Sequence, residues 1–277
     1  MKIMLWERKN FYLFCIDTMI MKKMTIVGAF VLCLLSTLSA QSVRAVSNNT
    51  NTWFMYFGSH KLSDKWGLHL EAQVRRSEFL AQSQQLLARV GVNYHFSPQV
   101  FATVGYCFVE TEPYGKLPVR SSFPENRLWE QLQLRHQVGS FEWISRFRLE
   151  QRYVQVPVLK GTIYAAGDAI YTNRFRILNR FSIPFKGKTI VDKSFYLSIF
   201  DEIMVNFGEK VALNIFDQNR IYAAIGYKLP KVGRLELGYL NQMIIRGDGK
   251  TIENNHTLQV GLNANIDFYK KPMPVQK

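Results

Sequence analysis

Hydrophobic and polar residues alternate along most of this chain after residue 52. The segment 141–153 shows the pattern clearly, because every second residue except Ile144 is charged and the residues between them are mostly aromatic or aliphatic. Successive side chains of a β-strand point to opposite faces, so such a segment has one charged face and one apolar face. Three arginines and two glutamates share the charged face, which indicates a charged interior and an apolar surface that contacts lipid.

Segments with this alternation recur along the rest of the chain. Each is about nine to fourteen residues long, which is the length that a tilted strand needs to cross a bilayer. The predicted strands are 52–60, 66–78, 84–96, 100–110, 126–138, 141–154, 170–182, 194–206, 218–228, 234–246 and 255–268. No segment with helical periodicity competes with them, so the chain is predicted to be all-β.

The connections between these strands alternate between short and long. The short turns are 61–65, 97–99, 139–140 and 229–233, and the long connections are 111–125, 155–169 and 207–217. Short periplasmic turns and long outer loops are typical of outer-membrane barrels, which in bacteria have even strand numbers. We therefore expect an antiparallel transmembrane β-barrel of about 12 strands, with ten as the alternative. Residues 41–51 would supply the twelfth strand or a segment inside the barrel.

The N-terminal region has the pattern of a secretory signal peptide. Lys22 and Lys23 precede an apolar run at 26–38, and small residues follow up to Ala40. We expect cleavage after Ala40, with Ala45 as the alternative site. The apolar run is too short to cross a membrane as a helix, which favours a cleaved signal over a permanent anchor.

Residues 1–20 precede this signal, so we expect synthesis to begin at Met21 or Met24. The predicted organisation is a signal peptide with its upstream extension at 1–40, an N-terminal segment at 41–51, the barrel at 52–268 and a C-terminal tail at 269–277. Of the three cysteines only Cys107 lies beyond the signal, so we expect no disulfide within the mature chain.

Aromatic residues lie near the ends of many predicted strands. In membrane barrels such residues form girdles at both interfaces between lipid and water. The candidates for these girdles are Trp53, Trp66, Phe96, Phe101, Trp129, Phe141, Phe181, Tyr227 and Phe268.

The chain is basic, with a formal net charge of +14 at pH 7. A protein that binds nucleic acid gathers such charge in one patch or along one helix. Here the arginines are spread at alternate positions of separate strands, and the chain carries a secretion signal. We therefore expect no nucleic-acid partner.

Several short polar motifs follow one another in a particular order along the predicted strands. They are Glu125-Asn126-Arg127, Glu130-Gln131, Arg146-Phe147-Arg148-Leu149-Glu150, Asn173-Arg174-Phe175-Arg176, Asp201-Glu202, Asp217-Gln218-Asn219-Arg220 and Gly238-Tyr239. By their order and spacing the chain resembles the "domain of unknown function 2490" family of Gram-negative outer-membrane β-barrels, from Trp53 to Phe268. The resemblance implies an outer-membrane barrel without an assigned activity, and it brings no catalytic residues.

The alternation places many charged side chains on the inward face of the predicted barrel. This candidate ladder consists of Glu71, Arg75, Arg89, Arg127, Arg135, Arg146, Arg148, Glu150, Arg152, Arg174, Arg176, Arg180, Glu202 and Arg220. Arginine forks bridge carboxylates and amides on neighbouring strands, so one interpretation is a structural ladder inside a narrow barrel. The other interpretation is a basic pore that selects small anionic solutes. Small barrels are nearly filled by side chains, which favours the structural ladder.

An enzyme that modifies membrane lipids is an alternative from another class. His69 and His95 are the histidines predicted on the inward face. They are accompanied by no Gly-x-Ser-x-Gly motif and by no histidine–serine spacing that would indicate a catalytic pair. His-x-x-x-His motifs, paired cysteines and regularly spaced acids are missing as well. The sequence therefore predicts no catalytic residue, no metal site and no cofactor.

Together these patterns predict an integral outer-membrane β-barrel of a Gram-negative bacterium, exported through a cleaved signal and inserted by the barrel-assembly machinery. Its expected partners are membrane lipid and small anionic solutes. The predicted role is non-enzymatic, either structural or as a narrow channel with an arginine-rich lumen. A lipid-modifying hydrolase of the outer membrane and a soluble periplasmic β-protein are the alternatives.

Overall fold

A computed structural model describes residues 45–116 and 118–269. The predicted signal peptide at 1–40 and most of the predicted tail at 269–277 lie outside these residues. The strands are β1 (Ala45–Lys61), β2 (Trp66–Ser77), β3 (Gln82–His95), β4 (Val100–Thr111), β5 (Phe123–Val138), β6 (Phe141–Val154), β7 (Pro157–Lys160), β8 (Ile163–Ala166), β9 (Ile170–Pro184), β10 (Phe195–Phe207), β11 (Phe216–Leu229), β12 (Gly233–Ile245) and β13 (Thr251–Ala264). Within the described ranges, no helix is long and apolar enough to cross a membrane.

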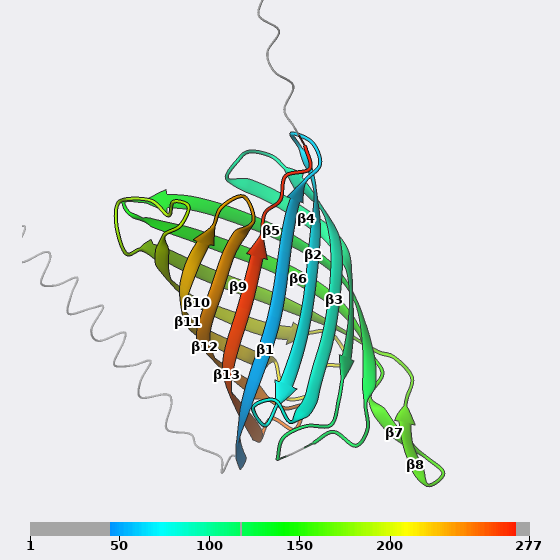
Figure 1. Cartoon of the computed structure of the whole chain (residues 1–277). Coiled ribbons are helices and arrows are strands. Elements are labelled where there is room, and N and C mark those ends of the chain that lie inside the picture. Colours follow the sequence, from blue (N-terminus) through cyan, green and yellow to red (C-terminus); the bar gives the residue numbers. More distant parts are fainter. Residues whose placement is uncertain (1–44, 117, 270–277) are drawn as a thin grey trace, which may run out of the picture. The chain divides into compact units, whose positions relative to one another are not determined.

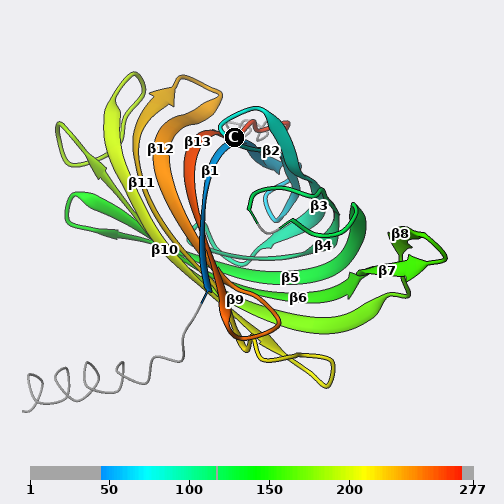
Figure 2. The same ribbon diagram turned by 90° about the horizontal axis from the view of Figure 1, so that it is seen from below.

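Eleven of these strands form one closed barrel, whereas β7 and β8 form a separate small hairpin (Figures 1 and 2). The strand order around the barrel is β1-β13-β12-β11-β10-β9-β6-β5-β4-β3-β2. Neighbouring strands are antiparallel except for β1 and β13, which run parallel and close the barrel. Because strand direction reverses at each connection, a barrel with an odd number of strands must contain one such parallel pair.

The strand count corrects the prediction of about 12 strands, or ten, because the barrel has eleven. Each alternating segment identified in the sequence corresponds to one barrel strand. Residues 45–51 do not form a further strand but extend β1, since no turn separates them from Trp53. Asn49 pairs with Asn255 in the same register as the rest of β1. The even-number rule for bacterial barrels, and not the alternation, produced the error.

Short turns and long connections lie mainly at opposite ends of the barrel, as the sequence predicted. The turns β1–β2, β3–β4, β5–β6 and β11–β12 mark the short-turn end (Figure 1). The tightest of them, between β5 and β6, contains Gly139 with a φ of 58°, a conformation that favours glycine. The long-loop end carries the 112–122 loop, the β7–β8 hairpin and residues 208–215. The hairpin lies within the predicted 155–169 loop and was not predicted.

Side chains alternate between the outer and the inner face of the barrel wall. Outward-facing Val74, Leu128 and Ile221 are about half exposed, as are many other large apolar residues on this face. Buried polar residues face inward. This arrangement inverts that of a soluble β-sandwich and produces a surface suited to lipid.

Two carboxylates interrupt the apolar outer face near the middle of their strands. Asp201 accepts a hydrogen bond of 2.6 Å from Asn219, and Glu130 accepts one of 3.1 Å from Gln151. Each carboxylate therefore has an amide donor on the neighbouring strand.

The predicted aromatic girdles are wrong for Phe101, which lines a cavity inside the barrel, and for two tryptophans. Trp53 and Trp129 lie inside the barrel and are 0% and 1% exposed, because they share the inward phase of their strands. At the short-turn end, Trp66 contacts Tyr94 and Tyr94 contacts Phe96, with ring centroids 4.9 and 5.1 Å apart. Trp66 and Phe96 are exposed, so an outer aromatic cluster does occur at this end.

Candidate functional site

The residues of the candidate ladder lie on the inner face of the barrel wall, with one partial exception. The buried or half-buried members are Glu71, Arg75, Arg89, Arg127, Arg146, Arg148, Glu150, Arg152, Arg174, Arg176, Arg180, Glu202 and Arg220. Arg135 is near the short-turn end of β5, and 47% of its side chain is exposed.

Glu150 on β6 lies at the centre of an ion-pair network that crosses the barrel. Its fully buried carboxylate accepts hydrogen bonds from Arg89 on β3 at 3.0 Å and from Arg176 on β9 at 2.8 Å. Arg127 Nη1 lies 3.6 Å from the second carboxylate oxygen. Since β4 and β5 separate β3 from β6, the Arg89–Glu150 contact spans the interior.

Glu202 on β10 continues the network toward β11. Its carboxylate accepts hydrogen bonds of 2.6 Å from Arg146 and 2.7 Å from Arg176, and Arg220 Nη1 lies 3.6 Å away. Arg176 therefore joins Glu150 to Glu202. Because removing one partner of a buried ion pair costs about 3–5 kcal/mol, this network holds the strands it connects in fixed positions.

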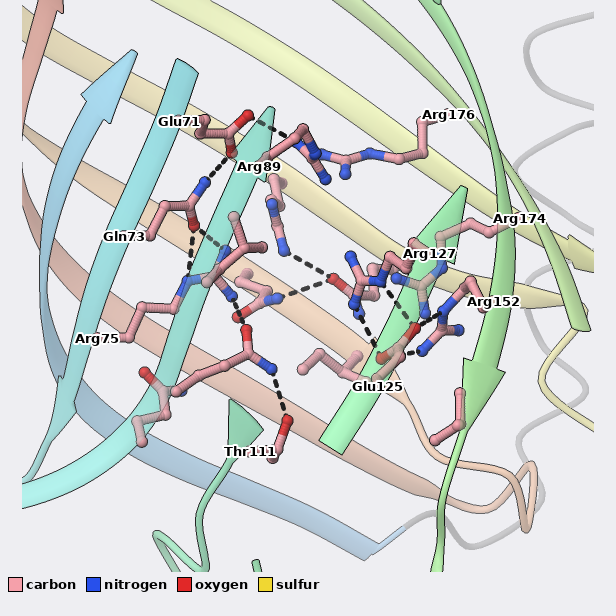
Figure 3. Close-up of a pocket in the computed structure, with 18 of the residues that line it drawn as sticks. Glu71, Gln73, Arg75, Arg89, Thr111, Glu125, Arg127, Arg152, Arg174 and Arg176 are labelled. Atoms are coloured by element: carbon pink, nitrogen blue, oxygen red, sulfur yellow. Dashed lines mark hydrogen bonds and ion pairs between the residues drawn. The ribbon is translucent and has the colours of Figure 1, made fainter. Parts of the chain in front are cut away.

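Two carboxylates that the sequence analysis did not assign to the ladder complete it at the long-loop end. Glu125 accepts hydrogen bonds from Arg127, at 2.7 and 2.9 Å, and from Arg152 (Figure 3). Asp217 lies 2.7 Å from Arg174. Both were missed because β5 and β11 begin before the predicted segments. The alternation, continued backwards, would have placed Glu125 on the inner face together with Arg127. It would have placed Asp217 on the outer face, because a register irregularity between β10 and β11 turns this residue inward.

A second group of ion pairs and hydrogen bonds lies toward the short-turn end. Glu236 accepts hydrogen bonds from Arg180 at 3.1 Å, from the Tyr196 hydroxyl at 2.9 Å and from the Tyr222 hydroxyl at 3.3 Å. Arg234 donates to Glu142 at 2.7 Å. The carboxylate of Glu236 is thus surrounded by donors from β9, β10 and β11.

The charges are concentrated on one side of the barrel. We call the inner face of β5, β6 and β9 the charged wall, and the inner face of β1, β12 and β13 the amide wall. Amide groups hold the amide wall together, with hydrogen bonds of 3.1 Å from Asn49 to Asn255, 3.4 Å from Asn255 to Gln242 and 2.8 Å from Gln242 to Gln218.

Three cavities follow one another through the interior. The long-loop vestibule has a volume of about 200 Å³ and reaches Thr111 and Tyr114, whereas the short-turn vestibule has about 170 Å³ and reaches Phe101. Between them lies a constriction of about 40 Å³. It shares Arg176 with the first vestibule and Arg146 with the second. The smallest of the three cavities therefore lies where the ion-pair network crosses the interior.

The 112–122 loop contacts the mouth of the long-loop vestibule. The Tyr114 hydroxyl donates a hydrogen bond of 2.5 Å to Glu253, and the Lys116 amide donates one of 3.3 Å to Asn49. Burial and the adjacent Glu253 carboxylate raise the pKa of Tyr114 above its usual range. The hydroxyl therefore stays protonated and remains a donor at neutral pH.

The protein-family comparison accounts for most of this barrel. The model of the family described as "Protein of unknown function (DUF2490)" matches residues 50–253. The chain belongs to the DUF2490 family. This result confirms the resemblance drawn from the order of the polar motifs. No curated protein matches the DUF2490 chain.

Solved structures similar to this DUF2490 barrel include three proteins with low sequence identity. A NanC porin is 10% identical with a TM-score of 0.40, and the match covers 72% of this chain and 91% of that chain. The outer-membrane expressed OmpT of Vibrio cholerae is 11% identical with a TM-score of 0.35, covering 73% and 58%. The siderophore receptor PirA from Pseudomonas aeruginosa is 8% identical with a TM-score of 0.26, covering 66% and 32%. These similarities carry no inference about activity.

The two candidate histidines of the DUF2490 barrel contact acidic and aromatic side chains. His69 Nε2 lies 3.5 Å from Glu71 and its ring packs on Trp129 at 5.2 Å, while His95 packs on Phe101 at 5.1 Å. No serine within residues 45–116 and 118–269 has a hydrogen bond to either ring. Over the same ranges, no three His, Cys, Asp or Glu residues are grouped to hold a metal ion.

Proposed function

We propose that this DUF2490 protein is an integral outer-membrane β-barrel whose arginine-rich lumen forms a narrow channel for small anions. The apolar outer face supports the membrane location, because a soluble protein does not expose an apolar surface of this extent. The secretion signal predicted at the N-terminus supports export, and insertion would follow through the barrel-assembly machinery. Fractionation of cells tests the location. Recovery in the soluble periplasmic fraction without detergent would contradict it.

The observation that carries the anion preference is the composition of the two vestibules. Seven arginines and two glutamates line the long-loop vestibule, and five arginines and one glutamate line the short-turn vestibule. Rings of arginine lower the energy of an anion in a pore and raise that of a cation. The excess of arginine at both ends therefore favours anions along the whole path.

The constriction sets the expected size of the current. At about 40 Å³, it is lined by Arg146, Arg148, Arg176 and Glu202, so a solute has to pass between side chains that also brace the wall. We therefore expect a small conductance, well below that of a wide water-filled barrel.

Planar-bilayer recordings of the purified full chain in asymmetric potassium chloride test this function. We expect discrete openings whose reversal potential is shifted from zero toward the equilibrium potential of chloride. The anion preference should decrease as the salt concentration rises, because mobile ions screen the arginines. Absence of conductance or a preference for cations would contradict the proposal.

A further inference from the structure

Arg75 and Arg148 differ from the other buried arginines of the interior. They are 7% and 1% exposed, yet neither forms an ion pair with a carboxylate among the described residues. A buried guanidinium without a counter-charge is costly, so its presence calls for a specific partner.

The two side chains are held in the same way. Arg148 donates through Nε and Nη2 to Gln131 Oε1, at 3.0 and 2.6 Å, and its guanidinium lies 4.7 Å from the centre of the Trp129 ring. The Gln131 amide thus orients the Arg148 guanidinium without neutralising its charge, and the face of Trp129 offsets part of the cost of burying it.

The corresponding contacts of Arg75 follow this pattern on the other side of the constriction. Arg75 donates through Nε and Nη2 to Gln73 Oε1, at 3.0 and 2.5 Å, and through Nη1 to Gln85 at 2.7 Å (Figure 3). Its guanidinium lies 3.9 Å from the centre of the Trp53 ring. Arg75 lines the long-loop vestibule, and Arg148 lines the constriction and the short-turn vestibule.

We propose that Arg148, Gln131 and Trp129 form a binding site for an organic carboxylate, and that Arg75 with Gln73 and Trp53 forms a second anion site beyond the constriction. The proposal rests on the channel function above and names the class of solute. Arg148 Nη1 has no hydrogen-bond partner among the described residues, so it is free to donate to an anion in the cavity. A planar guanidinium fork matches the two oxygens of a carboxylate.

The wall around Arg148 favours a carboxylate that is attached to an apolar body. Phe57, Phe101, Ile144 and Leu178 line the short-turn vestibule together with Arg148. These side chains provide contact area for a ring or an alkyl group. The other arginines of this vestibule already form ion pairs with Glu142, Glu202 or Glu236, so Arg148 is the one that a solute carboxylate would neutralise. The long-loop vestibule is lined mainly by arginine, glutamine and glutamate, so it is the less selective of the two sites.

Calorimetric titration of the purified full chain in detergent tests the Arg148 site, with benzoate and inorganic phosphate as probes. We expect Arg148→Gln to weaken benzoate binding roughly ten- to hundredfold, because the charged hydrogen bonds are lost. Arg148→Lys keeps the charge but not the planar fork, so its affinity for benzoate should lie between those of the wild type and Arg148→Gln. Arg76→Gln is the matched control and should leave benzoate binding unchanged, because the Arg76 side chain donates to the Leu80 carbonyl and lines none of the three cavities.

The outcomes separate this proposal from the channel function. Equal benzoate affinity in the wild type and in either Arg148 variant would overturn the site, and phosphate binding as tight as benzoate binding would overturn the assignment to an organic acid. If Arg148→Gln fails to fold, Arg148→Lys decides the question. Anion-selective conductance without benzoate binding refutes the site alone, whereas benzoate binding without conductance refutes the channel alone.

Discussion

The charged wall and the amide wall enclose the same interior but stabilise it by different means. On β5, β6 and β9, arginines and glutamates form ion pairs that reach across the barrel, as between Arg89 and Glu150. On β1, β12 and β13, amides bond mainly to their neighbours on adjacent strands, as between Asn49 and Asn255. Loss of a charged side chain leaves its partners buried without a counter-charge, whereas loss of an amide leaves one hydrogen bond unmade. The two walls arise from the same strand alternation, but the charged wall is destabilised much more by loss of a single side chain than the amide wall is.

The two walls also differ in the size of their side chains. Gly238 on the amide wall faces Ala224 so closely that an added Cβ would lie 2.4 Å from the Ala224 Cβ and 2.5 Å from the Ala223 carbonyl oxygen. Gly261, on the next strand, would place a Cβ no closer than 3.8 Å to its nearest neighbour. The amide wall therefore differs from place to place in its tolerance of an added methyl group.

The largest effect is expected from Glu150→Gln on the charged wall. This change removes the carboxylate shared by Arg89, Arg127 and Arg176 and should lower the free energy of unfolding by about 3–5 kcal/mol. Urea unfolding in detergent measures the loss. Glu130→Gln, the same substitution on the outer face, serves as the control and should change stability by less than about 0.5 kcal/mol. Similar losses in both variants would show that the inner network has no special role.

An intermediate effect is expected from overpacking the amide wall. Gly238→Ala should destabilise the barrel by about 1–3 kcal/mol, because the new methyl group meets backbone that cannot move without disturbing the strand pair. Gly261→Ala on the same wall should be nearly neutral. The temperature at which the folded barrel unfolds on a denaturing gel compares the two, and equal temperatures would contradict the close approach of β11 and β12.

A smaller effect is expected from Asn49→Ala. The change removes the hydrogen bond to Asn255 and the acceptor for the Lys116 amide, so we expect a loss of about 1 kcal/mol. Faster proteolysis within the 112–122 loop should accompany it. Asn48→Ala, on the outer face of the same strand, is the matched control. Unchanged proteolysis in the Asn49 variant would show that this contact does not hold the loop.

The smallest effect concerns the exposed turn that joins β12 to β13. Hydrogen bonds from the Thr251 side chain and from the backbone amides of Thr251 and Lys250 lower the pKa of Asp248 to about 2. Because the folded pKa lies below the ordinary value of 3.8, the carboxylate stabilises the turn at higher pH and loses this contribution as the pH falls through 2. Asp248→Asn does not titrate, so its stability difference from the wild type should shrink over this range. Parallel stability curves would contradict the assignment.

The sequence was sufficient for the barrel strands because the alternation is long and regular in each of them. It did not reveal the odd strand number, since the parallel pairing of β1 with β13 depends on closure of the whole sheet and not on any local pattern. The inward set of arginines followed from the alternation, but their partners did not. Whether Arg89 meets Glu150 is decided by the width and register of the closed barrel, and the neutral environments of Arg75 and Arg148 follow from the same geometry. Trp53, Trp129 and Phe101 were misplaced because an aromatic residue near a strand end does not itself show which face it lies on. Counting alternate residues along each strand places all three inside.

The parallel seam between β1 and β13 also has a consequence for the order of folding. Most strands of the barrel pair with a neighbour that follows closely in the chain, whereas Asn49 and Asn255 at the seam are 206 positions apart. Loop closure over such a separation carries the largest chain-entropy cost in the barrel, so the seam forms after the antiparallel hairpins. Until the seam forms, the sheet has two unpaired edges. The edge of β1 that faces β13 keeps its backbone donors and acceptors exposed, although the other edge already pairs with β2.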